Sequence, residues 1–203
     1  MEPISKVNLE RLTNGIYAFT MTLMIRNIQN PVPGSITSDL SLDKYLIATS
    51  LSIVDFIGAF IILGMFWLFY FQIFNRMKTF DFRFIHLHLL SLMVVVFVPF
   101  TQGFTNDNAA IPAAEVLFQI NYLILAILLI AAWHYARTHP ALLVPEMTDA
   151  EASFLSKKFL VPLCVALIGI AMAIAGIGYF DLLYLLPFVI IGVFFRHPPA
   201  EAS

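Results

Sequence analysis

The chain has 203 residues, of which 60% are hydrophobic and 12% are charged, and its formal net charge at pH 7 is −2. Charged residues make up about a quarter of a soluble globular domain, so this composition excludes that class and predicts an integral membrane protein. The small net charge, without a basic arm or a zinc-type motif, argues against nucleic acid as a partner. We expect the lipid bilayer, monovalent ions and further copies of the chain as partners.

Six apolar runs approach the roughly 20 residues that cross the hydrocarbon core of a bilayer. They predict an all-α, polytopic membrane protein in a single domain, residues 1–203, and the period-2 alternation of a transmembrane barrel is absent. The predicted helices cover residues 9–28, 44–74, 84–102, 113–136, 159–177 and 180–195. Only a few residues separate the last two runs, so these should form a helical hairpin.

The first run, residues 9–28, is the most polar of the six because threonines and an asparagine interrupt it. A helical period of 3.6 residues sorts its side chains into two neighbouring stripes. One stripe consists of Gly15, Phe19, Thr22 and Arg26, and the other of Thr13, Tyr17, Thr20, Met24 and Asn27. Because hydrocarbon cannot hydrogen-bond a hydroxyl, either stripe could line an aqueous path or pack against another helix. Threonines that bond back to carbonyls of their own helix are an equal alternative.

The second run, residues 44–74, carries a carboxylate about eleven residues from its start, or about 16 Å along a helix. This depth predicts that Asp55 lies well inside the bilayer, where a carboxylate is a candidate ion or proton site. The alternative is a neutral Asp55 that is hydrogen-bonded to Ser50, Ser52 or a neighbouring helix. Trp67 and Tyr70, near the end of this run, are typical of an interfacial aromatic belt.

The later runs contain few groups that could perform chemistry. His86 and His88 diverge by about 200° on a helix, so they cannot bind one metal ion together, and single histidines bonded across helices are the favoured interpretation. Cys164 is the only cysteine, which excludes a disulfide within the chain, and we interpret it as a small buried hydrophobe. We therefore predict no metal site, no cofactor and no enzyme activity.

The basic residues are distributed unevenly among the connections. Nine lysines and arginines lie before the first run, after the second and fourth runs or after the sixth, whereas Arg26 and Lys44 flank another connection. Lysine and arginine mark cytoplasmic connections. Both termini should therefore be cytoplasmic, in a protein that crosses the plasma membrane several times.

The order of these stretches resembles one family. The first run reads NLERLTNGIYAFTMTLMI, with Gly15, Ala18, Thr22 and Leu23 in step with the opening motif of that family. FIILGMFWLFYFQIF and a basic turn follow, then LHLLSLMVVVFVPFTQGF with a Pro-Phe pair at Pro99, then NYLILAILLIAAWHYA. Taken together, the chain is similar to the prokaryotic members of the transmembrane protein 175 family, which are potassium channels of the lysosomal type.

The resemblance implies a homotetramer of six-helix subunits, in which the first helices meet on the central axis and form a pore for potassium. In this family apolar side chains on the first helix narrow the ion path, with a threonine layer nearby. Carried over, the constriction consists of Phe19, Thr22 and Leu23, with Arg26 at a position where the family usually has leucine. The sequence contains no TVGYG-type segment, which agrees with a pore that lacks a carbonyl filter.

The opening motif is degenerate in this chain. The arginine of the family falls at Asn8. The residues that replace the Phe-Ser-Asp segment before Gly15 are Leu12, Thr13 and Asn14. Asn14 cannot carry the negative charge of the aspartate, so the polar network that this motif forms in the family has to be rebuilt from other side chains.

We expect this helix-packing network to involve Tyr70, His88 and Trp67. Tyr70 stands where the family usually has a histidine near the end of the second helix. Arg11 lies one turn along from Asn8 and is a candidate replacement for the missing arginine.

Two other functions stay open from the sequence. Four copies of Arg26 at an outer pore mouth would repel cations, so the same fold could conduct anions, unless Arg26 turns toward headgroups or toward Asp39 or Asp43. The second alternative is a proton-coupled transporter that uses Asp55 and His88, although no inverted repeat favours it.

Overall fold

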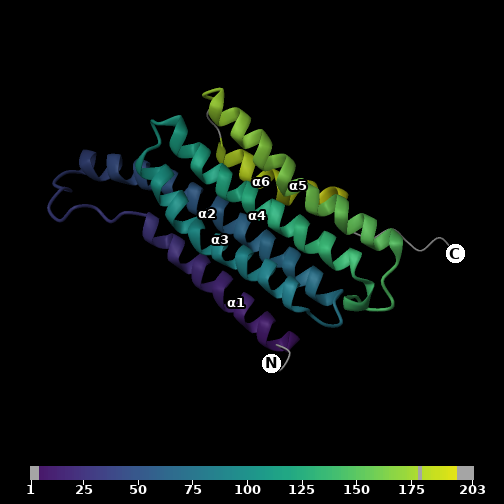
Figure 1. Ribbon diagram of the computed structural model, residues 1–203. Helices are drawn as coiled ribbons and strands as arrows, with labels where there is room; N and C mark the ends of the chain where they lie inside the picture. The colour runs from purple at the N-terminus through teal and green to yellow at the C-terminus, as the bar shows by residue number, and fades with distance from the viewer. Residues whose placement is uncertain (1–4, 178–179, 196–203) are drawn as a thin grey trace.

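The structure is a computed structural model that describes residues 5–177 and 180–195 (Figure 1). Its helices are α1 Lys6–Leu23, α2 Asp39–Asn75, α3 Phe82–Asp107, α4 Pro112–Thr138, α5 Asp149–Ile174 and α6 Phe180–Phe194, with short 3-10 helices η1 Met24–Asn27 and η2 Pro140–Leu142. The predicted all-α class with six helices is therefore confirmed. Within the described residues, α2, α3, α4 and α5 are each long and apolar enough to cross a bilayer.

Side-chain caps explain where several helices begin. Ser5 precedes α1 and accepts a hydrogen bond from the backbone N–H of Asn8, and Asp81 does the same for Phe84 at the start of α3. Ser38 forms a reciprocal capping box with Ser41 before α2. Each such cap satisfies a backbone donor that the helix leaves unpaired, which stabilises the helix by about 1 kcal/mol.

α5 begins ten residues earlier than predicted, at Asp149 instead of residue 159. Thr148 caps it, and acidic Asp149 and Glu151 in the first turn interact favourably with the positive end of the helix dipole. The early turns are amphipathic, because Ala152 and Leu155 are buried between polar neighbours. The predicted start was wrong because charged residues lower the mean hydropathy of a segment that is nevertheless a helix.

Two smaller predictions also need correction. α3 continues past Pro99 to Asp107, five residues beyond the predicted end at 102. Cys164 is exposed on α5, so its interpretation as a buried hydrophobe was wrong.

The helices form a bundle with α1 at one edge and the pair α5 and α6 at the other (Figure 1). α1 packs against α2 and α3, α4 packs against both α3 and α5, and α6 contacts α5 and α2. Gly176 has a φ of 67° just after α5, a backbone conformation that glycine adopts without strain. The hairpin expected for the last two helices is therefore present.

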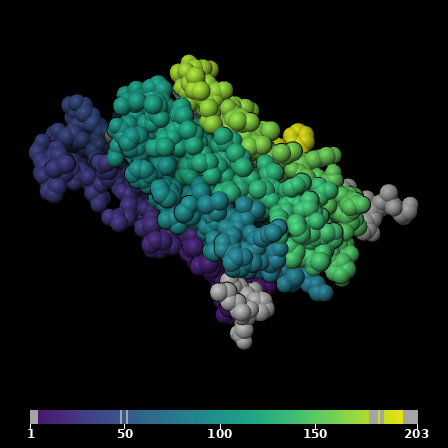
Figure 2. Space-filling model, viewed as in Figure 1, coloured from purple at the N-terminus to yellow at the C-terminus, as the bar shows by residue number. Residues whose placement is uncertain are grey.

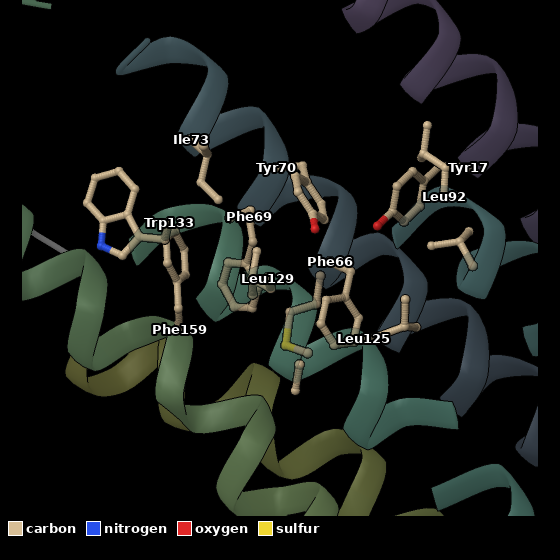
Figure 3. Packing of buried hydrophobic residues seen from close by; sticks show 14 of the residues in the cluster. Tyr17, Phe66, Phe69, Tyr70, Ile73, Leu92, Leu125, Leu129, Trp133 and Phe159 are labelled. Carbon is tan, nitrogen blue, oxygen red and sulfur yellow. The ribbon is translucent and has the colours of Figure 1, made fainter. Parts of the chain in front are cut away.

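The core is built from large side chains that project from the helices into the centre of the bundle, and Leu183 of α6 also belongs to it (Figure 3). The labelled core residues in Figure 3 are Tyr17, Phe66, Phe69, Tyr70, Ile73, Leu92, Leu125, Leu129, Trp133 and Phe159. Phe159 packs edge to face against both Phe69 and Trp133, with ring centroids 5.1 and 5.7 Å apart. These ring contacts hold α2, α4 and α5 together in the centre of the bundle.

Hydrogen bonds between distant parts of the chain define the two ends of the bundle. At one end the ammonium of Lys6 donates to the carbonyl of Met77 at 2.9 Å, and the backbone N–H of Lys78 donates to the carbonyl of Leu142 at 2.7 Å. The start of α1, the α2–α3 turn and the α4–α5 connection therefore meet there. At the other end Gln29 donates to Asp107 at 3.0 Å. We refer to these as the basic end and the acidic end.

The first part of α2 projects beyond the acidic end of the bundle (Figures 1 and 2). In its hydrogen-bonding orientation the amide of Asn106, one residue before the end of α3, donates to the carboxylate of Asp55 at 3.2 Å. The segment from Asp55 to Asn75 is about 30 Å long, which matches the hydrocarbon core. Asp55 therefore lies level with the end of α3, at the outer boundary of the bundle. Its position well inside the bilayer stays a prediction. Residues 39–54 extend about 24 Å further.

Candidate functional site

α1 has one covered and one uncovered face. Its buried side chains, together with Met24 at the start of η1, are each at most 2% exposed: Leu9, Thr13, Tyr17 and Thr20. The exposed ones include Gly15, Phe19, Thr22 and Arg26, and Leu23 is partly buried. The two stripes predicted from the sequence thus differ in role: one packs within the subunit, and the other is left uncovered by its own chain.

The uncovered stripe places the apolar ring of Phe19 one turn from the hydroxyl of Thr22. Phe19 is 61% exposed, and the hydroxyl of Thr22 donates to the carbonyl of Phe19 at 2.8 Å. A hydroxyl that donates to the backbone keeps its lone pairs, so Thr22 can present an acceptor to a cation. Arg26 follows one turn later in η1, and within the described residues no ion pair joins it to Asp39 or Asp43.

Near the basic end, a buried hydrogen bond connects α1 to α3. The hydroxyl of Thr13 lies 2.8 Å from the carbonyl of Leu9 and 2.7 Å from Nε2 of His88. Because a threonine hydroxyl has one proton, donation to Leu9 leaves it to accept from His88, which assigns the proton of the imidazole to Nε2. Thr13 thus forms both contacts that the sequence left open, a hydrogen bond to a carbonyl of its own helix and a hydrogen bond to another helix.

Aromatic rings enclose this histidine. The ring centroids of Tyr70 and Phe74 lie 4.5 and 5.1 Å from that of His88, and Tyr70 and His88 are fully buried. Figure 3 shows the hydroxyls of Tyr17 and Tyr70 directed toward each other from α1 and α2. The structure thus brings two members of the expected network, Tyr70 and His88, together with Thr13.

The third expected member makes a different contact. The indole N–H of Trp67 donates to the side-chain oxygen of Asn14 at 2.8 Å. Trp67 therefore connects α2 to α1 at the residue next to Thr13, which is the partner of His88. Asn14 keeps the acceptor role that an aspartate would have, without its charge. Arg11 is exposed and has no hydrogen bond to any described residue, so it does not take the expected place in this network.

A second polar contact, which the sequence reasoning missed, holds α1 near the acidic end. The amide of Asn27 donates to the carbonyl of Pro99 at 3.0 Å and to the side-chain oxygen of Gln102 at 2.9 Å. A Cβ atom at Gly103 would lie 2.9 Å from Asn27, so only glycine leaves room for this approach. The available signal was a pair of amides at the ends of two apolar runs. α1 is therefore attached to α3 at both ends.

Replacing Thr13 with valine should lower the thermal stability of the protein. The change leaves the buried Nε2–H of His88 without an acceptor, at a cost of about 1–3 kcal/mol, and it should lower the apparent melting temperature by several degrees. Thr22→Val is the matched control, because Thr22 also bonds back to its own helix but is exposed. Equal melting temperatures for the two variants in a fluorescence-monitored melt would contradict this role of Thr13.

These features define a class: a multi-pass helical membrane protein whose first helix is attached along one face and uncovered along the other. The sequence model of the family described as endosomal/lysosomal potassium channel TMEM175 matches residues 8–99, which contain most of α1, all of α2 and most of α3. This match agrees with the resemblance to that family inferred from the sequence.

Individual relatives agree with the family match. The chain is 25% identical over 154 residues to a potassium channel of Chamaesiphon minutus, covering 74% of this chain and 75% of the relative. It is 26% identical over 138 residues to a potassium channel of Streptomyces collinus, covering 64% of each chain. Its fold is similar to the crystal structure of a lysosomal potassium-selective channel TMEM175 homolog from Chamaesiphon minutus, with a TM-score of 0.77 and 20% identity over 91% of this chain and 95% of that one.

Proposed function

We propose that this chain is the subunit of a passive potassium channel, in which four copies of α1 surround a central pore. The proposal is supported by the match to the TMEM175 family and by the description of both relatives as potassium channels. It assigns no enzyme activity, cofactor or metal site to the chain.

The uncovered face of α1 is the observation that carries the proposal. Asn14, Thr22 and the charged Arg11 and Arg26 are exposed around the same helix as Phe19. Polar and charged side chains are costly against hydrocarbon, so a lipid-facing helix would not use them. A shared axis gives this face both water and neighbouring subunits, and closed rotational symmetry is the usual arrangement of identical subunits.

The projecting part of α2 also favours an assembly. Leu40, Leu46 and Ile47 are between 53% and 67% exposed. They lie in residues 39–54, beyond the end of α3. Large apolar side chains outside a bilayer are usually covered by another protein surface, and neighbouring copies on a fourfold axis would supply one.

The geometry suggests how such a pore would conduct. A ring of four Phe19 side chains forms an apolar constriction that blocks ions by excluding water. Thr22 offers the first oxygen ligands to a partly dehydrated ion beside this ring. Because α1 is attached to α3 through both Thr13–His88 and Asn27–Gln102, a widening that keeps these contacts moves the two helices together.

Orientation forms a further part of the proposal. The Lys6 contact brings the start of α1 to the same end as Arg76 and Lys78. An end rich in basic residues is expected on the cytoplasmic side. We therefore place the basic end and both termini in the cytoplasm, with the protein in the plasma membrane.

Current through the purified protein in a planar bilayer under a KCl gradient tests the proposal. A potassium channel should give a reversal potential near that of potassium. The detergent-extracted particle should have the mass of four chains. A monomeric particle, or no current above that of protein-free bilayers, would overturn it.

Anion conduction is the second candidate, and one observation favours it: Arg26 is exposed and, within the described residues, has no ion pair. In the same experiment it predicts a reversal potential near that of chloride. The transporter alternative loses support, because Asp55 lies beside Asn106 at the outer boundary of the bundle.

A further inference from the structure

A cavity of about 200 Å³ lies at the basic end, on the side of the bundle where α2, α5 and the end of α6 meet. Its polar lining consists of Gln72, Asn75 and Arg76 from α2 and Glu151 and Lys158 from α5, with Phe195 among its apolar walls. Pockets that enclose a drug-sized ligand have volumes of about 300–1,000 Å³. This cavity is therefore suited to one small charged group.

Lys158 is the unusual residue of this cavity. Lys158 is only 9% exposed, and its ammonium donates to the side-chain oxygen of Gln72 at 3.2 Å. An ammonium has three donors. Glu151 is the acid of the cavity lining, and it forms its ion pair with Arg76. Within the described residues no acid forms an ion pair with Lys158. Burying a charge without an opposite charge is unfavourable, so Lys158 calls for an anionic ligand.

The surrounding groups indicate which anion fits. Arg76 contributes guanidinium donors, and Gln72 and Asn75 contribute amide donors, an arrangement that suits the several oxygens of a phosphate. Two cations and one carboxylate leave the lining with one net positive charge. Glu151 competes with the ligand for Arg76 and thereby limits its affinity.

The location indicates where the anion comes from. The cavity is lined by α2, α5 and Phe195, and the pair α5 and α6 lies at the edge of the bundle opposite α1 (Figure 1). Gln72 lies about one helical turn from the end of α2 that we place on the cytoplasmic side. Around a central α1, this side faces lipid at the depth of the headgroups. Basic pockets between transmembrane helices on the cytoplasmic side are suited to anionic lipid headgroups.

We propose that this cavity binds a phosphate group, carried by an anionic phospholipid of the cytoplasmic leaflet or free in the cytosol. The site goes beyond the proposed channel function and does not depend on conduction, although the lipid source rests on the proposed orientation. Binding can therefore be measured on protein that passes no current.

Thermal melts of the intact, full-length protein in detergent test the site, with phosphatidylglycerol, phosphatidylcholine or inorganic phosphate added at constant ionic strength. Phosphatidylglycerol should stabilise the wild type, and Lys158→Met should weaken its apparent affinity about tenfold, the loss expected for one charge-assisted hydrogen bond. Lys157→Met is the matched control, because Lys157 is the adjacent lysine but is exposed. It should bind as tightly as the wild type.

Each further outcome decides the proposal. Stabilisation by inorganic phosphate that depends on Lys158 supports the site and identifies the free anion as its ligand. Equal effects of phosphatidylcholine and phosphatidylglycerol without any stabilisation by inorganic phosphate, or equal losses in the two lysine variants, overturn it. If Lys158→Met does not fold, Glu151→Gln provides the test, because removal of the competing carboxylate should tighten binding several-fold, and unchanged or weaker binding overturns the proposal.

Discussion

Potassium flux through the protein should rise about tenfold when Phe19 is replaced with alanine. Four phenylalanine rings around an axis exclude water from the narrowest part of the proposed pore, and four methyl groups leave room for a hydrated path. A tenfold increase corresponds to a barrier lower by about 1.4 kcal/mol, a modest demand for the removal of four large apolar side chains. A liposome flux assay with a potassium-sensitive dye measures the effect.

Phe100→Ala is the matched control for this experiment. Phe100 on α3 is 62% exposed, and Phe19 is 61% exposed, so the two substitutions remove the same side chain from surfaces that are equally uncovered by their own chain. Only Phe19 belongs to the helix that we place on the axis. If the two variants conduct alike, or if Phe19→Ala conducts like the wild type, Phe19 is not part of the constriction.

Periodicity identified the two stripes of α1 but could not say which of them is covered. Tyr17 and Phe19 are two residues apart and similar in size, yet one is 1% exposed and the other 61%. The difference arises from α2 and α3, which pack on one side of α1 alone. A helical projection records which side chains share a face, whereas the neighbours of that face depend on contacts between distant parts of the chain.

The inner contact of α1 illustrates the same limit. Thr13 and His88 are 75 residues apart, and each was considered separately as a polar group that needed a partner. The sequence predicted correctly that His88 would form a single bond across helices. It could not pair His88 with Thr13, because no local pattern encodes a contact between the first and third helices.

Hydropathy found the helices but not where the end of one helix lies beside its neighbours. The outer part of α2 contains Leu46 and Ile47 and so reads as part of an apolar run, which predicted a deep position for Asp55. Only the contact with Asn106 shows that α3 ends beside Asp55. An error did occur in α5, where the capping residue Thr148 was a readable signal that the low hydropathy of the next turns concealed.

Replacing Arg26 with leucine should increase potassium conductance and shift the reversal potential toward that of potassium. In water, one charge acts on an ion about 8 Å away with about 0.5 kcal/mol, so four symmetric copies contribute about 2 kcal/mol before screening. Screening at physiological salt reduces this to an increase of roughly threefold, and lower salt should enlarge it. Planar bilayer recordings under a KCl gradient at two ionic strengths measure both quantities.

Lys44→Leu is the control for a general effect of surface charge, because Lys44 is an exposed cation on the projecting part of α2 and precedes Asp55 by about three turns. The comparison of Arg26→Leu with Lys44→Leu separates a charge in the pore mouth from a general surface charge, because salt screens both. A charge in the pore mouth acts on every permeating ion, so its removal must matter most at low salt. If Arg26→Leu leaves conductance and reversal potential unchanged at both salt concentrations, Arg26 faces the headgroups, and the anion alternative loses the one observation that favours it.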